Sequence, residues 1–297
     1  MEETPIPLKT SVLIVSYNMA AALRRCLDAL ARSAERESFE IIVVDNGSED
    51  DSTSVTNSFP SVTPLRLPRN FGFVKALNIA MRTAKGEFFL FLNPKTEVQP
   101  DTVSALTAKL ERSADAVAVS PALMAPDGQP ASRLYRLPRA QDLRRTARAG
   151  EFQPAAAPES TSETTAVEFA GFAALIVRGY FLKGLRYIDE RYAQSWADAE
   201  IALQIRRAGK KTLFSPDVRA VWHAEDDLRQ SMPAAPRDLL AAEWILGAAT
   251  YGAKHFGFMT GLKVRLAGIL SALFSFRLRR LGYLVSTQKI DGTQSVM

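Results

Sequence analysis

Residues 11–50 read SVLIVSYNMAAALRRCLDALARSAERESFEIIVVDNGSED, and this stretch decides the fold. It opens with a short β-branched run, Ser11–Ser16, which predicts a strand. Apolar residues then recur at helical spacing over residues 20–30, which predicts an amphipathic helix. A second β-branched run, Ile41–Val44, predicts a buried strand that ends at Asp45.

The same alternation of strand and helix continues toward residue 120. Three apolar runs predict further strands, at Thr63–Leu67, Phe88–Leu92 and Ala116–Ser120. Helices are predicted over Ala76–Ala84 and from Pro100-Asp101 onward. Strands that alternate with helices predict an α/β fold with a mostly parallel, Rossmann-like sheet. In such sheets, ligands bind beyond the carboxyl ends of the strands.

The second half of the chain resumes this pattern after an interruption. Residues 149–168 are rich in Ala, Pro, Ser, Thr and Glu, which predicts a flexible loop. A strand over Phe169–Val177 and a helix over Ala199–Ala208 are expected next, and Thr212–Trp222 is expected to form a hairpin. We therefore expect one α/β domain over residues 1–235.

Basic charge gathers in the C-terminal segment, residues 236–297, which we expect to be helical. The formal net charge of the whole chain is +5. Residues 1–243 contain 30 basic and 31 acidic residues, whereas the last 54 residues contain seven and one. This distribution argues against nucleic acid as a partner of the main body. It favours an anionic membrane surface as a partner of the tail.

An 11-residue apolar run in this segment, Leu266–Phe276, has Lys and Arg residues on both sides. It is too short for a membrane span, which needs about 20 residues. Two interpretations stay open, and they do not exclude each other. The segment is either a helical cap packed on the main domain or an amphipathic helix that lies on anionic lipid.

Composition and missing motifs exclude several classes of protein. Apolar residues make up 47% of the 297 residues, which is enough to build a core. The one cysteine excludes an intramolecular disulfide, and with two histidines it cannot build the usual four-ligand zinc site. The absence of GxxxxGKS/T and of GxGxxG argues against a P-loop NTPase and a dinucleotide oxidoreductase. The N-terminal MEETPIPLKT lacks the apolar run of a secretory signal, so we expect a cytoplasmic location.

Polar turns follow four of the predicted strands. They are Ser16-Tyr17-Asn18, Asp45-Asn46-Gly47-Ser48, Arg69-Asn70-Phe71-Gly72-Phe73 and Asn93-Pro94-Lys95-Thr96-Glu97. Each one alone is also explained as ordinary turn chemistry, because Asn, Asp, Gly and Pro form turns anywhere. Their joint placement at one edge of one sheet predicts a ligand site there.

These stretches together resemble an inverting family 2 glycosyltransferase with the GT-A fold, close to the bacterial rhamnosyltransferase-like branch. The matching stretches occur in the family's order and cover roughly residues 10–225. They are VLIVSYNMAAALRRCLDAL, FEIIVVDNGSEDDS, RNFGFVKALNIAM, GEFFLFLNPKTEVQPD, FAGFAALIVR, IDERYAQSWADAEIALQIRRAG and AVWH. The tail stretch YGAKHFGFMTGLKVRL resembles the family's C-terminal helical segment more loosely.

The resemblance implies a set of residues that bind the donor nucleotide, namely Ser16, Tyr17, Asn18, Asp45, Asn70 and Gly72. Asp45 would accept hydrogen bonds from a base N–H or a ribose hydroxyl. Gly72 would allow the backbone to approach the ligand closely. An alternative for Asp45 is that it only caps the turn that follows it.

The resemblance also implies that Asp198 is the general base. It would take the proton of an acceptor hydroxyl as that oxygen attacks the anomeric carbon, with inversion in one displacement. We expect the start of the helix after Asp198 to keep its pKa low. Glu200 is expected to support Asp198 without touching the substrate. The alternative is that Asp198 is a plain helix cap.

The sequence departs from the family at Lys95, where related enzymes carry the aspartate that holds a divalent metal. Ala197 likewise stands where an acidic residue is common. An aspartate with a divalent ion and a lysine both carry a net charge of +1. We therefore hypothesise that Lys95 contacts the donor diphosphate directly. His223 is expected to bind the diphosphate, or Mg²⁺ or Mn²⁺ if a metal is used, although a structural role is the alternative.

The expected function is transfer of a hexosyl or rhamnosyl group from a nucleotide-diphosphate sugar. The expected acceptor is lipid-linked or a cell-envelope polysaccharide, at the inner face of the cytoplasmic membrane. Lys95 keeps a second interpretation open, in which the protein binds a nucleotide sugar or a partner without catalysis. A third is a membrane-bound scaffold that uses only the tail.

Overall fold

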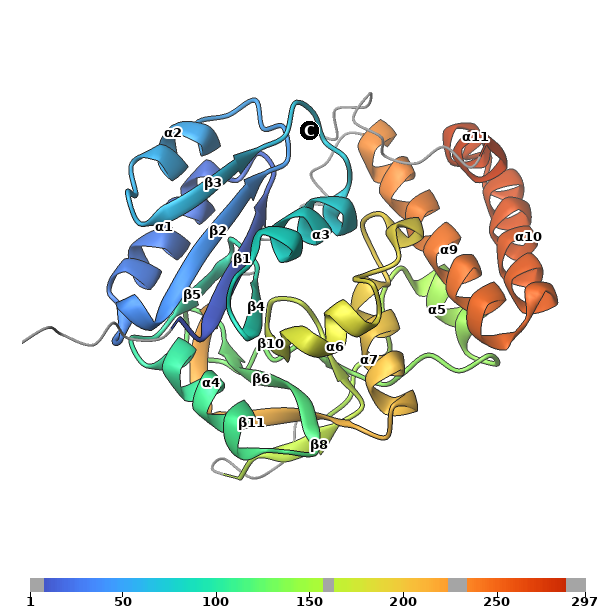
Figure 1. Cartoon of the computed structure of the whole chain (residues 1–297). Helices are drawn as coiled ribbons and strands as arrows, with labels where there is room; N and C mark the ends of the chain where they lie inside the picture. The colour runs from blue at the N-terminus through green and yellow to red at the C-terminus, as the bar shows by residue number, and fades with distance from the viewer. Residues whose placement is uncertain (1–7, 157–162, 224–233, 287–297) are drawn as a thin grey trace, which may run out of the picture.

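The computed structural model describes residues 8–156, 163–223 and 234–286 (Figure 1). Within these residues, a nine-stranded sheet has the order β3-β2-β1-β4-β10-β6-β11-β5, with β8 paired to β11. Its strands are β1 (Thr10–Ser16), β2 (Phe39–Asp45), β3 (Val62–Arg66), β4 (Phe88–Leu92), β5 (Thr96–Val98), β6 (Ala116–Met124), β8 (Thr165–Val167), β10 (Ala174–Arg178) and β11 (Lys211–Trp222). A separate pair joins β7 (Leu134–Tyr135) to β9 (Phe169–Ala170).

The sheet is mostly parallel, as the alternation of strands and helices predicts. β2 pairs in parallel with both β1 and β3, β1 pairs in parallel with β4, and β6 pairs in parallel with β11. β10 runs antiparallel between β4 and β6, and β5 runs antiparallel along β11. The carboxyl ends of β1, β2, β3 and β4 therefore lie along one edge of the sheet (Figure 1).

Helices cover both faces of the sheet, which is why the strands are apolar on both sides. In β1, Val12 and Ile14 belong to one apolar cluster and Leu13 to the other. On the first face lie α1 (Ala20–Ala31), α2 (Ser52–Asn57) and α4 (Thr102–Arg112). On the second face lie α3 (Phe73–Thr83), α5 (Leu143–Ala149), α6 (Gly179–Gly184) and α7 (Ala197–Arg207). Short 3₁₀ turns are η1 (Arg36–Ser38) and η2 (Glu190–Tyr192).

One expectation from the sequence is wrong. Thr212–Trp222 is not a hairpin, because β11 continues as one strand along β6 with an irregularity between Ser215 and Arg219. The turn-forming residues there produce a bulge, in which the Ser215 hydroxyl donates to Asp217 at 2.7 Å. The expected loop over residues 149–168 includes the short strand β8 near its end, which pairs with β11. Its central residues 157–162 lie outside the described residues.

The C-terminal segment is helical, as expected, with α9 (Ala234–Phe256), α10 (Phe258–Phe274) and α11 (Leu278–Ser286). Helix α9 packs into the same apolar cluster as α3 and α7, through Ala242, Ala248 and Tyr251. Helix α10 lies close against α9, because a Cβ at Gly261 would come within 2.4 Å of the Ala249 carbonyl oxygen. The segment is therefore a helical cap on the second face (Figure 1).

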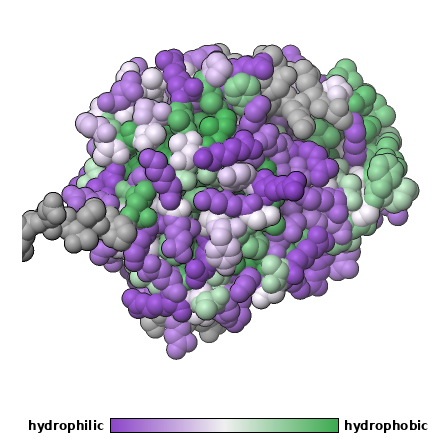
Figure 2. Space-filling view, viewed as in Figure 1, coloured by the Kyte–Doolittle hydropathy of each residue, from purple (hydrophilic) through white to green (hydrophobic). Residues whose placement is uncertain are grey.

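The outer side of this cap is apolar. Figure 2 shows apolar surface gathered at the edge of the molecule that α10 and α11 form. The large exposed side chains there are Phe258, Met259, Leu266, Leu270, Leu273, Phe274, Phe276, Leu278 and Val285. No helix within the described ranges is both long and apolar enough to cross a membrane.

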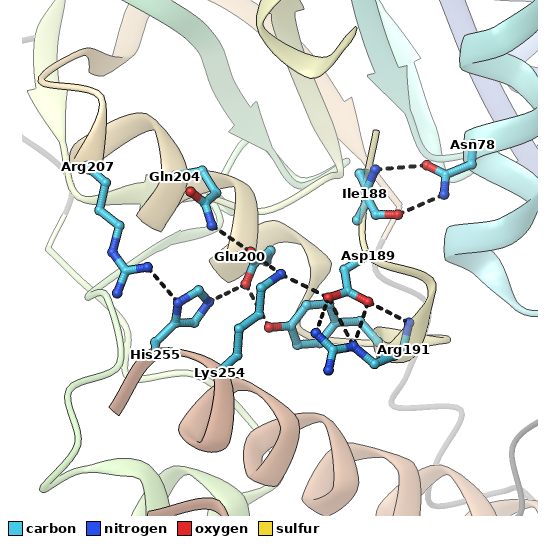
Figure 3. A network of polar contacts seen from close by, with 10 residues as sticks. Asn78, Ile188, Asp189, Arg191, Glu200, Gln204, Arg207, Lys254 and His255 are labelled. Atoms are coloured by element: carbon cyan, nitrogen blue, oxygen red, sulfur yellow. Dashed lines mark hydrogen bonds and ion pairs between the residues drawn. The ribbon is translucent and has the colours of Figure 1, made fainter. Parts of the chain in front are cut away.

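Helix α9 is fixed to α7 by a buried carboxylate, Glu200, whose side chain is 4% exposed (Figure 3). Its oxygens accept hydrogen bonds from Tyr192 at 2.7 Å, Gln204 at 2.9 Å and His255 at 2.5 Å. Lys254 forms an ion pair with it at 2.9 Å. Burial acts to raise the pKa of Glu200, but these four partners outweigh burial and lower it to about 2.

The protonation of His255 follows from its neighbours. Arg207 can only donate, and its Nη1 lies 2.8 Å from His255 Nδ1. We therefore assign the lone pair to Nδ1 and the proton to Nε2, which donates to Glu200 (Figure 3). Lys254 also bonds Asp189 at 2.9 Å, so the same network reaches the turn before η2.

Replacing Glu200 with glutamine should lower the free energy of unfolding at pH 7 by about 3 kcal/mol, because the Lys254 ammonium and the buried His255 N–H lose their charged partner. Urea unfolding measures this. The control is Glu111→Gln, which removes an exposed ion pair to Lys9 and should cost less than about 1 kcal/mol. The lowered pKa makes the contribution of Glu200 complete above pH 4.5 and lost as the pH falls toward 2. A deficit that does not shrink at low pH would contradict this origin.

Candidate functional site

The ends of β1 and β2 bring together the residues at the start of the predicted nucleotide site. Ser16 lies opposite Asp45 in the parallel register, and the Asn46 amide donates to the Ser16 carbonyl at 2.8 Å. Asn18 has a left-handed backbone with φ of 51°. Its side-chain oxygen accepts from the Glu49 amide at 2.8 Å, which ties the turn after β1 to the turn after β2.

Asp45 is buried and holds its own turn. Its Oδ1 accepts from the Ser48 amide at 2.9 Å, and its Oδ2 accepts from the Thr53 hydroxyl at 2.7 Å. The turn-capping role that the sequence left open is therefore present. A carboxylate oxygen can accept more than one hydrogen bond, so contact with a nucleotide stays a prediction.

Asn46 joins this edge to the turn after β3, and the sequence analysis did not select it. Its amide nitrogen donates to Asn70 at 2.9 Å, and its oxygen accepts from the Phe71 amide at 2.9 Å. The Asn70 oxygen also accepts from the Gly72 amide at 2.8 Å. Both asparagines were visible in polar turns, but nothing in the sequence indicated that they pair across 24 residues.

The turns after β2 and β3 meet so closely that only glycine fits at position 47. Gly47 has φ of 79°, and a Cβ there would lie 2.5 Å from the Arg69 carbonyl carbon. Gly72 faces a different segment, since a Cβ added there would have the backbone of Ala193 as its nearest neighbour. The Val74 amide donates to the Ala193 carbonyl at 2.9 Å, which connects this edge of the sheet to the segment before α7.

Asp198 lies in a cavity of about 680 Å³ beside this segment. Residues from distant parts of the chain line this cavity. They include Phe73, Asn93, Arg133, Tyr135, Phe152, Gly171, Gln194, Trp196 and Trp244. Asp198 is half-buried, and its Oδ1 accepts from the Ala199 amide at 2.9 Å. Its Oδ2 faces Gly171, because a Cβ added to Gly171 would lie 3.6 Å from this oxygen.

The expectation of a low pKa for Asp198 is wrong. Burial raises the pKa of this carboxyl to about 6, although the Ala199 amide and the charge of Arg133 act to lower it. The first turn of α7 contributes one amide hydrogen bond, and the desolvation that comes with burial outweighs it. A carboxylate with this pKa is a stronger base than an ordinary aspartate and is still ionised at neutral pH.

Several lining residues were not selected from the sequence. Phe152, Trp196 and Trp244 pack together, with ring centroids 4.8–5.3 Å apart. They come from three segments distant in the chain, so no local pattern links them. Trp196 has a left-handed backbone with φ of 74°, a rare conformation for a bulky residue that is associated with functional sites. Arg133 lies over the rings of Tyr135 and Trp222.

Lys95 and His223 are neighbours beyond the end of β4. The His223 amide donates to the Lys95 carbonyl at 3.0 Å. The Lys95 amide donates to Asn93, whose own amide bonds the Ala173 carbonyl, and both Asn93 and Ala173 line the Asp198 cavity. Among the described residues, none forms an ion pair or hydrogen bond with the Lys95 ammonium.

The His223 side chain already has a partner, since its Nε2 lies 3.1 Å from Glu97 Oε2. Among the described residues, these two side chains are the candidate metal ligands beside Lys95. In the part of the chain that the structure describes, no group of three or more His, Cys, Asp or Glu side chains could hold a metal ion. The described residues therefore supply fewer than three such ligands at this position.

Glu200 lies outside the cavity lining and faces α9. Of the predicted site residues, the structure thus groups Ser16, Asn18, Asp45, Asn70 and Gly72 at one edge. Tyr17 follows Ser16 at that edge and is half-buried. Asp198 lies in the adjoining cavity, and Lys95 with His223 lies next to the Asn93 side of that cavity.

Gly47→Ala should destabilise the fold more than Gly128→Ala. Both glycines have a left-handed backbone, which costs an alanine about 1–2 kcal/mol. A Cβ at Gly128 meets nothing within 4 Å, whereas one at Gly47 strikes the Arg69 backbone. The clash should add about 1–3 kcal/mol to the loss of unfolding free energy, measured by urea unfolding. Equal losses in the two variants would show that the two turns do not meet as described.

Comparisons with known proteins agree with this architecture. Residues 11–159 match the family model for glycosyl transferase family 2. An uncharacterized glycosyltransferase of Bacillus subtilis, YfnE, is 39% identical over 87 residues, which are 28% of this chain and 22% of that protein. A PGL/p-HBAD biosynthesis glycosyltransferase of Mycobacterium tuberculosis H37Rv is 32% identical over 103 residues, which are 33% and 40%. The matches thus span less than half of these relatives' length.

A solved structure with a similar fold is the mannosyltransferase PcManGT from Pyrobaculum calidifontis, in complex with GDP-Man and Mn²⁺. Its TM-score is 0.56 at 17% identity, over 94% of this chain and 86% of that chain. This likeness supports the GT-A fold. The family model covers half of the chain, from β1 to beyond α5, and includes the edge that holds Asp45 and Asn70. The chain belongs to glycosyl transferase family 2.

Proposed function

We propose that this protein transfers a sugar from a nucleotide-diphosphate sugar to an acceptor hydroxyl with inversion, and that Asp198 is the general base. The observation that carries the proposal is the Asp198 carboxylate in its cavity of about 680 Å³, with a pKa raised to about 6. A base needs a pKa near the working pH and room for the hydroxyl that it deprotonates. Asp198 has both.

The donor binds at the edge built by Asp45, Asn46 and Asn70. Two features support this part of the proposal. The edge lies at the carboxyl ends of parallel strands, where α/β proteins bind nucleotides. It is joined to the Asp198 cavity through the contact of Gly72 and Val74 with Ala193. The neighbouring fold of PcManGT, solved with GDP-Man, is consistent with a nucleotide-sugar donor.

The reaction then needs one displacement. The acceptor oxygen forms a bond to the anomeric carbon while the bond from that carbon to the diphosphate oxygen breaks. The acceptor proton moves to Asp198, and the nucleoside diphosphate leaves with the bonding electron pair. The Lys95 ammonium, which has no partner among the described residues, would stabilise the negative charge that grows on the diphosphate. Attack opposite the leaving group inverts the anomeric centre.

The acceptor class and the location are part of the same proposal. The outer side of α10 and α11 is apolar, and the basic residues Lys263, Arg277 and Arg279 lie near it in the sequence. This combination suits peripheral binding to anionic lipid. A lipid-linked or polysaccharide acceptor of the cell envelope at the inner membrane face fits this surface. Transfer of rhamnose or another hexose rests on the family resemblance of the sequence.

The acid limb of the pH–rate profile should lie near pH 6, because the protonated Asp198 cannot act as a base. Asp198→Asn should lower kcat by about 10²- to 10⁴-fold without weakening donor binding. Arg133→Gln should move the limb to higher pH, because the charge of Arg133 lowers the pKa of Asp198. Arg136→Gln is the matched control and should leave the limb in place. A limb that stays near pH 6 in Arg133→Gln contradicts this electrostatic assignment.

Thermal stabilisation by a panel of nucleotide sugars, with Mn²⁺ and separately with EDTA, tests the donor site. We expect stabilisation to persist in EDTA and to be lost in Lys95→Ala but not in the exposed control Lys85→Ala. Transfer by the wild type should likewise survive EDTA. Stabilisation only with Mn²⁺, or transfer abolished by EDTA, would refute the role of Lys95. Stabilisation without transfer under any condition would favour a binding protein without catalysis.

A further inference from the structure

A second cavity, of about 520 Å³, adjoins the one that holds Asp198. It lies between α5 on one side and α9, α10 and α11 on the other. Gly150 and Trp244 line both cavities, so they form the boundary between the two. The Trp244 indole N–H donates to the Thr146 carbonyl at 3.0 Å, which fixes this boundary to α5.

The lining of this second cavity is strongly cationic. It contains Arg144, Arg145, Arg148 and Arg280 and no acidic residue. Arg144 and Arg148 are exposed, and in the described part of the chain they have no hydrogen-bond or ion-pair partner. Arg145 bonds Gln153 at 3.0 Å and lies 3.8 Å from Asp142. Three of these four arginines come from the short helix α5, within five residues of sequence.

Arg280 adds a second, independent observation. It reaches the cavity from α11, and its guanidinium bonds Asp238 at 3.0 Å. Its Nε is buried and has no hydrogen-bond partner within the described residues. An unsatisfied buried N–H costs free energy unless a ligand or water supplies an acceptor. The cavity thus offers several guanidinium groups, whose N–H donors pair well with phosphate oxygens.

The opposite wall of the cavity is apolar. Trp244 and Ile245 of α9 and Val264, Ala267 and Gly268 of α10 form it. The two helices meet tightly there, since a Cβ at Gly268 would come within 2.6 Å of Ile245. The same helix α10 exposes Leu266, Leu270 and Leu273 on its outer surface, where Figure 2 shows apolar area. Helix α10 thus contributes apolar residues both to the cavity and to the outer surface.

We propose that this cavity binds the phosphate or diphosphate group of an amphipathic acceptor, a sugar or alcohol joined through that group to a hydrocarbon chain. This inference rests on the proposed function. The arginines hold the anionic group, α10 receives the chain, and the acceptor hydroxyl passes the boundary at Gly150 and Trp244 to reach Asp198. The donor diphosphate is a separate ligand, because neither Lys95 nor any residue of the donor edge lines the second cavity.

Calorimetric titration of the full chain with dodecyl diphosphate, below its critical micelle concentration, tests the proposal. We expect the double variant Arg144→Gln/Arg148→Gln to bind at least tenfold more weakly than the wild type. The control is Arg24→Gln/Arg112→Gln, which removes the same charge from α1 and α4 on the far face of the sheet and should bind as the wild type does. Wild-type affinity should fall as salt is added.

Two further ligands test whether the cavity recognises a lipid-linked diphosphate, a free anion or a membrane surface. Inorganic diphosphate should bind at least tenfold more weakly than dodecyl diphosphate, because it lacks the chain. Equal affinity would overturn the proposal in favour of a simple anion site. Phosphatidylglycerol vesicles should bind the Arg144→Gln/Arg148→Gln variant nearly as well as the wild type. A defect with vesicles but not with dodecyl diphosphate would assign the arginines to the membrane surface and overturn it too.

Binding of the nucleotide-sugar donor distinguishes a failure of the proposed acceptor cavity from a failure of the proposed glycosyltransferase function. Stabilisation by the nucleotide sugar should be the same in Arg144→Gln/Arg148→Gln and in the wild type. Transfer to a dodecyl-diphosphate-linked acceptor should lose at least tenfold in kcat/KM, mostly through KM. If neither the wild type nor the double variant binds any nucleotide sugar, the proposed function is wrong. If donor binding is intact and the variant uses this acceptor as well as the wild type, the acceptor site fails alone.

Discussion

The buried carboxylate of Glu200 is the constraint on which the rest of the site depends. It lies two residues after Asp198 on α7, and its partners Lys254 and His255 come from α9. A buried charge of this kind is tolerated only when every oxygen has a partner, so α9 has one position that satisfies it. That position places Trp244 against Trp196 and closes the side of the Asp198 cavity. One ionic contact thus links the C-terminal cap to the proposed base.

Much of the fold could be predicted from the sequence because its signals are local. The runs at Ser11–Ser16, Ile41–Val44 and Phe88–Leu92 form the parallel strands that their composition indicates. The polar turns after them gather at one edge, as strand direction requires. The hairpin predicted over Thr212–Trp222 is wrong. Pro216-Asp217 is typical of a chain reversal, but pairing with β6 keeps the strand continuous through a bulge.

The electrostatics of the site could not be predicted in the same way. The helix start at Asp198 indicated a low pKa, but burial in a cavity also lined by Phe152, Trp196 and Trp244 reverses the direction. Those rings are separated by dozens of residues, and only the folded chain shows them together. Asn46 and Arg133 were missed for the same reason, because their roles come from Asn70 and Asp198 rather than from their neighbours in sequence.

The fit of Trp196 against Gly247 has a practical meaning for protein engineering. A Cβ at Gly247 would lie 2.6 Å from the Trp196 ring, so the ring and the helix backbone are complementary surfaces of a single core. A chimera that grafts the tail of a related protein onto this chain would have to carry the inward face of α9 unchanged. The graft would also have to keep Gly261 and Gly268 of α10, because an added Cβ at either position would strike Ala249 or Ile245 of α9.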